Sequence, residues 1–346
     1  MINLIYLVPS EKGPAGGINV ILQHSEIINK LKKNFTSKVI FIKKKKTSKW
    51  KNSFDKLINI NHKKSHSGWK FKQISIDKFY KGKWFNNNVV LKNNFNFDKK
   101  KDFVILPEIF AHFAKDLLIK NNINYAIFVQ NGLALNITDE YHLLDLAYSK
   151  AKFILSVSSH INESIKMAFP KTKKKIFKIN QAITTNNFSY KSKLKLITYM
   201  PRKLPHHSKL VLFFLRNNLP KGWRVLPLEK MNQTEVFKNL KKSKIFLSFS
   251  NLEGFGLPPL EAAISGNVVI GYTGEGGKEY WKNPIFKKIE QGDILGFVNK
   301  INSTIKNKFN YNSLNIHKRI LLKKYSHINQ KKKIFEMLKM IYKNFN

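Results

Sequence analysis

Short apolar runs that alternate with helical stretches constrain the fold of this chain more than any other feature of its sequence. The first run, NLIYLVP at 3–9, leads through a loop into a helical pattern over 18–31, and a second run, SKVIFI, follows at 37–42. Unbroken apolar runs of this length are typical of strands buried on both faces, as in a parallel sheet. The opening therefore predicts a β–loop–α–β unit of an open α/β sheet.

The same alternation continues along the chain in two series. In the first series we expect strands at 102–107, 125–130, 152–158 and 175–179, and helices around 110–120, 140–150 and 159–168. In the second series we expect strands at 195–201, 244–250 and 267–272, a helix from Leu257, and mostly helical sequence after Gly292. The polar stretch 180–193 has no periodicity and separates the two series.

Two such series joined by one linker predict two Rossmann-like, doubly wound α/β domains. We place the N-terminal domain at 1–180, the C-terminal domain at 181–330 and an amphipathic closing helix at 331–346. The Lys- and Asn-rich segment 43–101 interrupts the alternation, and we expect short strands and long loops there.

Composition narrows the class of protein. Apolar residues make up 42% of the chain and aromatic residues 13%, which is enough to form packed cores. No apolar run approaches the ~20 residues that cross a bilayer, and the first residues lack the basic and apolar regions of a signal peptide. With no cysteine there are no disulfides or thiolate metal sites. We expect a cytoplasmic protein.

The charge is extreme, with 63 Lys and Arg residues against 21 Asp and Glu residues and a formal net charge of +42. Such a surface attracts polyanions such as nucleic acid, anionic lipid or nucleotide phosphates. Two explanations stay open: the compositional bias of an AT-rich genome, or a basic surface selected to lie on the inner face of a membrane.

Two acids stand at a notable interval in the stretch NLEGFGLPPLEAAISGNVVIGY, 251–272. Glu253 falls in the predicted loop after one strand, and Glu261 falls about one turn into the following helix. Ligands of open α/β sheets bind at the carboxyl ends of strands, where this loop lies. The helix N-terminus offers unpaired N–H groups to a phosphate, and a carboxylate can accept hydrogen bonds from the two hydroxyls of a ribose. The pattern suits a ligand with a sugar at each end and phosphate between them.

These residues carry a resemblance to a known family. EGFGLPPLEAAISGNVVIGYTGEGGKEY is similar to the signature of group 1 (family four) glycosyltransferases, which have the GT-B fold of two Rossmann-like domains facing a central cleft. That signature has a Glu, seven residues and a second Glu, followed after the next strand by a Gly-Gly-x-Glu element. The stretches GPAGGINVILQHSEIINKL and SVSSHINESIKMAFP also resemble the family, so the likeness spans most of the chain except 43–101.

The resemblance implies roles for individual residues. Glu261 would hold the ribose of a nucleotide sugar, and Glu253 would contact the donor sugar or the departing phosphate. The backbone of Gly254, Phe255, Gly256 and Leu257 would line the donor site, and Gly16 and Gly17 would approach the diphosphate. The implied activity is a retaining glycosyl transfer from a nucleotide-diphosphate sugar to a glycan or lipid-linked acceptor, in the synthesis of a cell-surface polysaccharide.

The resemblance further implies that no metal ion takes part. Metal-dependent transferases use an Asp-x-Asp pair, which does not occur in this sequence. Cations at the end of the second domain's first strand would then stabilise the leaving diphosphate. Arg202 and Lys203 stand there, with Lys209 close behind, although the family's Gly-Arg pair is replaced here by Pro-Arg-Lys.

The acceptor is expected on the N-terminal domain. His112 follows the predicted strand 102–107, and relatives often place a histidine in this region against the donor sugar. Gln130 and Asn131 follow the next strand and suit sugar hydroxyls, although the Asn-Gly pair is equally suited to a turn.

Other functions stay open at this stage. A sugar-nucleotide epimerase or a phosphorylase would share the fold, although their signatures differ. A nucleic-acid-binding protein is suggested by charge and by the mixed cations and aromatics of 43–101, yet no nucleic-acid module is recognisable. The donor's base and sugar, the acceptor, the linkage and the oligomeric state are not determined by the sequence.

Overall fold

The computed structural model describes residues 1–10, 16–31, 34–45, 71–77, 89–179, 181–183, 193–307, 309–343 and 345. The chain divides into two compact units, each of which is described by itself. The first unit comprises Met1–Ser156, Ile161–Ile179 and Ile334–Asn346, and the second comprises Val157–His160 and Asn180–Lys333. Much of the predicted loop-rich segment 43–101 and most of the predicted linker 180–193 lie outside the described residues.

The first unit is built on a seven-stranded sheet in the order β3-β2-β1-β4-β5-β6-β7. Its strands are β1 (Ile2–Pro9), β2 (Phe35–Lys44), β3 (Ile74–Ile76), β4 (Asp102–Pro107), β5 (Asn124–Val129), β6 (Ile154–Ser156) and β7 (Ile176–Lys178). All neighbours are parallel except β3, which pairs antiparallel with β2 at the edge. The central strands are buried along nearly their whole length, as continuous apolar runs require.

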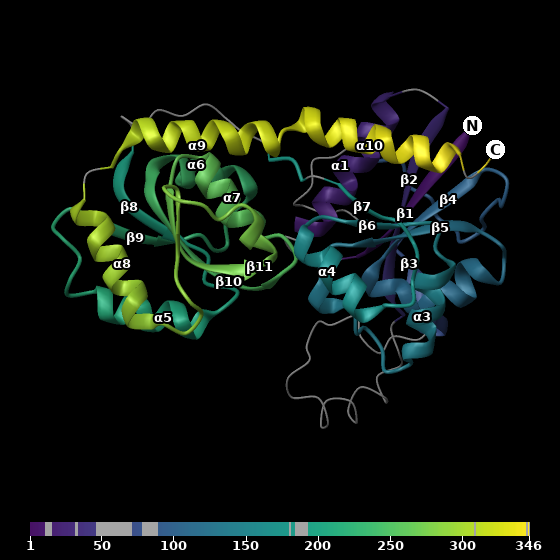
Figure 1. The fold of residues 1–346 in the computed structure, drawn as a ribbon, viewed down its shortest axis with the longest axis horizontal. Helices are drawn as coiled ribbons and strands as arrows, with labels where there is room; N and C mark the ends of the chain where they lie inside the picture. Colours follow the sequence, from purple (N-terminus) through teal and green to yellow (C-terminus); the bar gives the residue numbers. More distant parts are fainter. Residues whose placement is uncertain are drawn as a thin grey trace. The chain divides into compact units, whose positions relative to one another are not determined.

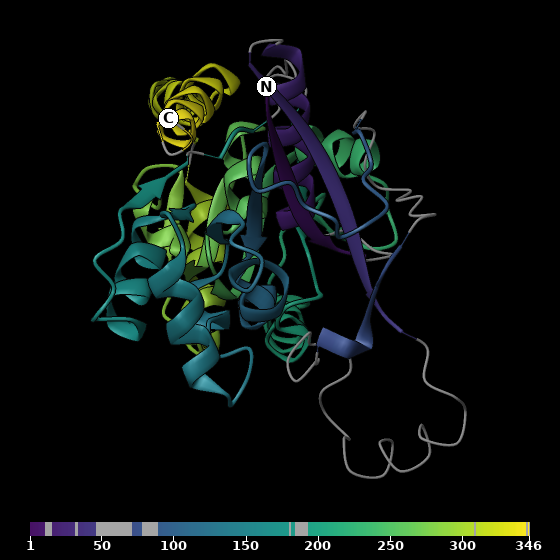
Figure 2. The same ribbon diagram turned by 90° about the vertical axis from the view of Figure 1, so that its right-hand side faces the viewer.

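Helices cover both faces of this sheet (Figures 1 and 2). They are α1 (Gly16–Leu31), α3 (Tyr141–Lys150) and α4 (Ser159–Ala168), with the short turns η1 (Phe71–Gln73), η2 (Glu108–Phe113), η3 (Lys115–Ile119) and η4 (Gly132–Ala134). Two residues of β5 that lie on opposite faces of the sheet contact helices on the two sides. Phe128 stacks under His24 of α1 with ring centroids 5.6 Å apart, whereas Tyr125 donates its hydroxyl to the Ala147 carbonyl of α3 at 2.6 Å.

The helix expected around 110–120 is present, but it is not a regular α-helix. The chain forms a 3₁₀ turn, η2, and then a single π turn, η3, so no regular α-helix follows β4. The segment is packed tightly, since Phe110, Phe113 and Leu118 are buried. An apolar pattern over so few residues cannot by itself distinguish these turns from an α-helix, because the 3₁₀ and π periods each differ from the α-helical period by less than one residue per turn.

The second unit is built on a five-stranded parallel sheet in the order β12-β11-β10-β8-β9. Its strands are β8 (Leu194–Tyr199), β9 (Arg224–Pro227), β10 (Ser243–Glu253), β11 (Val268–Glu275) and β12 (Phe286–Lys288). The predicted strands at 195–201, 244–250 and 267–272 correspond to β8, β10 and β11. The short strands β9 and β12 were not predicted, since four and three residues give little pattern.

Helices cover both faces of the second sheet as well (Figure 1). They are α5 (Pro205–Leu215), α6 (Gln233–Lys242), α7 (Leu257–Ile264), the turn η6 (Gly276–Glu279), α8 (Ile294–Lys306) and α9 (Tyr311–Lys324). On one face, Phe249 and Tyr272 are partners across β10 and β11, and Phe297 of α8 packs against both rings. Helices α6 and α7 pack on the other face, and α9 packs on α7. The α/β class predicted from the sequence is confirmed.

The last helix, α10 (His327–Tyr342), is divided between the units. Its residues up to Lys333 belong to the second unit, and those from Ile334 onward belong to the first. Within the first unit, Tyr342 packs on Phe35 and Phe345 packs on Phe103, with ring centroids 6.4 and 6.2 Å apart. Among the described residues, no helix is long and apolar enough to cross a membrane.

Buried polar side chains hold the helix ends at the amino edge of the second sheet. Asn267 donates to the carbonyls of Leu240 and Ala262 at 2.8 and 2.9 Å and accepts the Ser243 hydroxyl. Lys193 donates to the carbonyls of Leu240 and Ser265 at 3.1 and 2.5 Å. Carbonyls at helix ends have no partner within the helix, so these side chains supply hydrogen-bond donors to buried groups there.

We predict that Asn267→Ala lowers the free energy of unfolding by about 1–3 kcal/mol, because two hydrogen bonds to buried carbonyls are lost, while Lys193 still donates to Leu240 and the backbone N–H of residue 267 still donates to Ala262. Urea titration of the intact chain measures this. Asn218→Ala removes a similar amide-to-carbonyl bond from an exposed helix end and should change stability by no more than ~0.5 kcal/mol. Equal effects of the two substitutions would contradict the assignment.

Candidate functional site

The strand order of the second sheet identifies one position at the carboxyl ends of its strands. From β8 the chain moves outward to β9, and then returns to place β10 on the other side of β8. Such a reversal is a topological switch point, and ligands of open α/β sheets bind outside the carboxyl ends of the two strands that flank it. The segment after β8 carries Arg202 and Lys203. Glu253 is the last residue of β10, and Gly254–Leu257 follow it, so the structure brings these predicted residues to one position.

The two segments are joined by an ion pair. Lys203, in the turn after β8, lies 2.9 Å from Glu253, with side chains 39% and 23% exposed. A pair this exposed contributes little to stability, but it fixes a cation beside the Glu253–Glu261 motif. Arg202 is exposed and forms no hydrogen bond or ion pair with the described part of the chain. Its guanidinium is therefore open to solvent and to an anion.

Glu253 lies at the end of a strand, which corrects the expectation of a loop residue. Strand β10 continues through a register shift to Glu253, which pairs with Glu275 of β11. The two neighbouring acids are each neutralised by a lysine, since Lys278 lies 2.7 Å from Glu275. Like charges on adjacent strands destabilise a sheet, so these lysines offset that cost.

The turn Gly254–Gly256 leads directly into α7. Gly256, at the N-cap, has φ +79°, a left-handed conformation that glycine adopts without strain. The Phe255 side chain is buried between Tyr280 and Tyr325, with ring centroids 5.4 and 5.5 Å away, so only its backbone can contact a ligand. Leu257 begins the helix, and Pro258 and Pro259, which lack an N–H, follow it. Of the first four helical positions, only Leu257 and Leu260 therefore carry an N–H group that has no acceptor within the helix.

Glu261 stands alone within this site. Its side chain is partly buried, and its carboxylate accepts no hydrogen bond from the residues that the structure describes. Burial raises the pKa of this carboxyl from 4.5 to about 7. An unpaired, desolvated carboxylate is costly to a folded protein and is suited to receive hydroxyl donors from a ligand.

Sequence reasoning missed several residues that contact this turn. The Ser158 hydroxyl donates to the Gly254 carbonyl at 2.7 Å, and Tyr280 donates to the Gly256 carbonyl. Glu279, the acid of the Gly-Gly-x-Glu element, accepts the Ser159 N–H at 2.9 Å and the Tyr325 hydroxyl at 3.2 Å. Glu279 could have been found from its motif, but nothing near Ser158 in the sequence points to Gly254.

The first sheet has its own switch point, between β1 and β4. Gly16 and Gly17 begin α1, which follows β1, whereas residues 11–15 before them lie outside the described residues. Gln130, after β5, donates to the Gly17 carbonyl at 3.0 Å, and a Cβ at Gly17 would lie 2.6 Å from the Gln130 Oε1. The glycine permits this contact, so Gln130 packs on α1 directly.

Glu108 and His112 both lie in η2, after β4, and both are buried. Glu108 accepts the backbone N–H of Asn131 at 2.9 Å, and burial raises the pKa of its carboxyl to about 7. The His112 ring contacts Phe113, with centroids 3.9 Å apart. The predicted role of His112 at the donor sugar stays a prediction, and Asn131 serves the turn, since its side chain accepts the Leu133 N–H.

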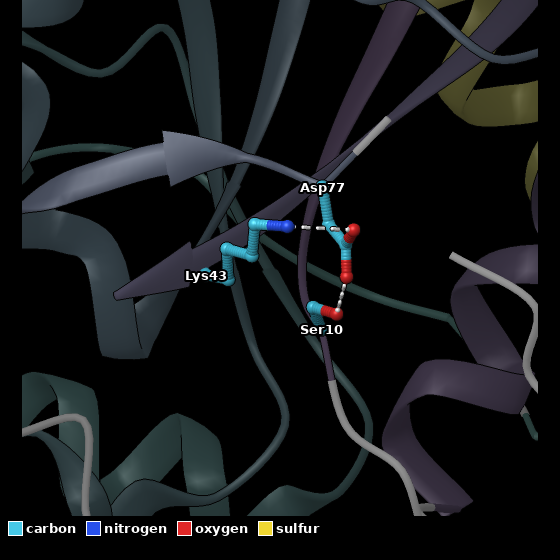
Figure 3. Close-up of polar contacts among 3 residues, drawn as sticks. All are labelled: Ser10, Lys43 and Asp77. Carbon is cyan, nitrogen blue, oxygen red and sulfur yellow. Dashed lines mark hydrogen bonds and ion pairs between the residues drawn. The ribbon is translucent and has the colours of Figure 1, made fainter. Parts of the chain in front are cut away.

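A polar cluster pins the antiparallel edge strand at the carboxyl ends of β1 and β2 (Figure 3). Asp77, just after β3, accepts the Ser10 hydroxyl at 2.5 Å and lies 3.0 Å from the Lys43 ammonium. Its N–H also donates to the Phe41 carbonyl at 2.7 Å. The described residues contain no group of three or more His, Cys, Asp or Glu side chains that could hold a metal ion.

Comparison with solved structures shows which proteins share this fold. Sucrose-phosphate synthase from Thermosynechococcus elongatus superposes with a TM-score of 0.67 at 9% identity, covering 99% of this chain and 100% of that one. TarM of S. aureus gives 0.66 at 13% identity, covering 100% and 99%. Anabaena Alr3699/HepE in complex with UDP gives 0.64 at 11% identity, covering 97% and 99%. At such identities the likeness shows the fold, which is the two-domain GT-B fold of glycosyltransferases.

Comparison with known sequences gives weaker evidence than comparison with solved structures. No family model matches the chain. A curated protein of Acidianus filamentous virus 2, named "Putative glycosyltransferase ORF330", is 29% identical over 101 residues. The match spans 26% of this chain and 31% of the length of that relative.

We predict that Glu261→Gln raises the melting temperature above pH 7. The folded chain holds the Glu261 proton up to about pH 7, whereas the unfolded chain releases it near 4.5, so ionisation destabilises the folded state as pH rises between these values. The glutamine cannot ionise. The melting-temperature difference should therefore be near zero at pH 4.5, grow until about pH 7 and then stay constant; a difference independent of pH would contradict this.

Proposed function

We propose that this chain is a retaining, metal-independent glycosyltransferase that uses a nucleotide-diphosphate sugar. The observation that carries the proposal is the meeting of three complementary groups at the β8–β10 switch point. These are the unpaired carboxylate of Glu261, the N-terminus of α7 and the cations of Arg202 and Lys203. A ligand with vicinal hydroxyls and phosphates matches all three groups.

The proposed roles follow from this chemistry. Glu261 accepts hydrogen bonds from the ribose hydroxyls of the donor, and the Leu257 N–H at the start of α7 binds the diphosphate. In the reaction, the bond between the anomeric carbon and the diphosphate oxygen breaks, and the acceptor oxygen bonds to that carbon. The acceptor's proton passes to the leaving diphosphate. Arg202 and Lys203 stabilise the charge that develops on this leaving group.

Lys203 has a second part in this scheme. In the free protein its ammonium is held by Glu253, 2.9 Å away. An arriving diphosphate competes for the same ammonium, and Glu253 is then released toward the donor sugar. The pair thus keeps the cation in position while the site is empty, at little cost because it is partly exposed.

The remaining assignments are proposals that rest on the family resemblance. Gly16, Gly17 and His112 of the first unit serve the diphosphate and the donor sugar, and the acceptor is a glycan or a lipid-linked glycan. UDP sugars are the first donors to test, since HepE and TarM were both crystallised with UDP. The excess of basic residues favours an anionic acceptor or a place on an anionic membrane.

We predict that Glu261→Ala weakens the binding of the cognate nucleotide sugar by about 10–100-fold, because hydrogen bonds to a charged group contribute about 1.5–3 kcal/mol. Calorimetric titration with a panel of nucleotide sugars measures this. Glu229→Ala, at an exposed acid of the same unit, should leave affinity unchanged. A wild-type protein that binds no nucleotide sugar would refute the proposed function.

Binding should also depend on pH. The ribose hydroxyls donate to the ionised carboxylate, and at pH 6 a group with a pKa of about 7 is ionised in only about one molecule in ten. We therefore expect affinity at pH 6 to be several-fold lower than at pH 8, and this dependence to disappear in Glu261→Gln. An unchanged pH profile in that variant would assign the titration to another group.

A further inference from the structure

We call the turn Gly254–Gly256 the donor turn. The carbonyls of its first and last residues each accept a hydrogen bond from a buried side chain outside the turn. The Gly254 carbonyl accepts the Ser158 hydroxyl at 2.7 Å, and the Gly256 carbonyl accepts the Tyr280 hydroxyl. Ser158 follows β6 of the first sheet, yet the segment Val157–His160 belongs to the second unit. A residue from a distant part of the sequence therefore helps to build this turn.

The donors of these bonds are held in place by a second set of contacts. Glu279 accepts the Ser159 N–H at 2.9 Å and the Tyr325 hydroxyl at 3.2 Å, so it anchors both the Ser158 segment and the turn after α9. The Ile183 N–H donates to the Tyr325 carbonyl at 3.0 Å. Tyr280 and Tyr325 are both buried, with ring centroids 6.2 Å apart.

These bonds have a directional consequence because a peptide group is planar and trans. The C=O of one residue and the N–H of the next point in opposite directions. Holding the Gly254 carbonyl toward Ser158 turns the Phe255 N–H away from it, and holding the Gly256 carbonyl toward Tyr280 does the same for the Leu257 N–H. Without such bonds, a turn that contains two glycines would sample many peptide orientations.

We propose that Ser158 and Tyr280 are positioning residues that aim the Phe255 and Leu257 N–H groups at the diphosphate of the donor. The proposal rests on the proposed function and adds residues that neither the Glu253–Glu261 motif nor the comparisons assign. Neither side chain touches the donor in this scheme. Each acts through a backbone carbonyl, and the benefit is a turn ordered before the ligand arrives, which lowers the entropic cost of binding.

The test compares variants that delete the same kind of bond inside and outside the turn. Tyr280→Phe and Ser158→Ala remove the two bonds to the turn. Tyr125→Phe removes a hydroxyl bonded at 2.6 Å to the Ala147 carbonyl of the first unit, and Ser303→Ala removes one bonded at 3.0 Å to the Lys300 carbonyl. Ser158→Thr keeps the hydroxyl and serves as the conservative variant.

The readouts are thermal unfolding, calorimetric titration with UDP, and competition by uridine, which lacks phosphates. We expect Tyr280→Phe and Ser158→Ala to weaken UDP binding about fivefold each, the equivalent of one hydrogen bond, with uridine binding unchanged. The two controls should bind UDP as the wild type does, even where they lower the melting temperature, and Ser158→Thr should recover most of the affinity.

The outcomes separate this proposal from the one on which it rests. If the wild type binds UDP, Glu261→Ala weakens that binding, and Tyr280→Phe and Ser158→Ala bind UDP normally, then the positioning role is wrong and the proposed function stands. Equal loss of UDP and uridine binding would also overturn it, because that pattern indicates general distortion of the site. If the wild type binds neither UDP nor any other nucleotide sugar, both proposals fail.

Discussion

The second unit depends on a close crossing of two backbone turns. The turn after β11 passes so near the turn after β10 that a Cβ at Gly276 would lie 1.9 Å from the Gly254 carbonyl oxygen. Only a residue without a side chain can stand there without moving the backbone. The crossing carries Glu279 and Tyr280 over the start of α7, where Tyr280 reaches the Gly256 carbonyl. The Gly-Gly-x-Glu element is therefore part of the same structure as the paired acids.

The acidic residues around this crossing differ in their ion pairs, hydrogen bonds and burial. Glu253 and Glu275 lie opposite each other on neighbouring strands, and each has a lysine within 3 Å. Glu279 is used to hold the backbone and the tyrosine hydroxyl. Among the described residues, Glu261 has no lysine partner and accepts no hydrogen bond, and desolvation raises the pKa of its carboxyl. The acid with the least support from its own chain is therefore the one best placed to gain from a ligand.

The charge of the whole chain sets the electrostatic background of this site. With 21 acids for 63 basic residues, at most a third of the cations can be neutralised in one-to-one ion pairs. The unpaired remainder creates a positive potential that favours any phosphate-bearing ligand and weakens with salt. In the proposed function, specific binding therefore comes from groups with fixed direction, such as the Leu257 N–H at the start of α7 and the Glu261 carboxylate.

Local patterns determined much of the fold. The run at 102–107 matches β4, and the helical pattern at 159–168 matches α4, because burial of consecutive or periodic apolar residues is written directly in neighbouring positions. The same patterns predicted the α/β class and two successive series of alternating strands and helices, one for each domain. They did not determine the helix type at η2 and η3, whose periods lie close to that of the α-helix, and they missed β9 and β12, which are too short to show a periodic pattern.

The sequence also predicted Glu253, Gly254–Leu257 and Glu261 as candidate site residues, because their spacing forms a linear motif. Only the tertiary structure decided that β8 and β10 flank a switch point, that Lys203 pairs with Glu253, and that Ser158 bonds to Gly254, 96 positions further along the chain. Strand order and contacts of this kind follow from how elements pack against one another. The physical reason is that burial fixes which face of an element turns inward, whereas the choice of partner depends on the rest of the chain.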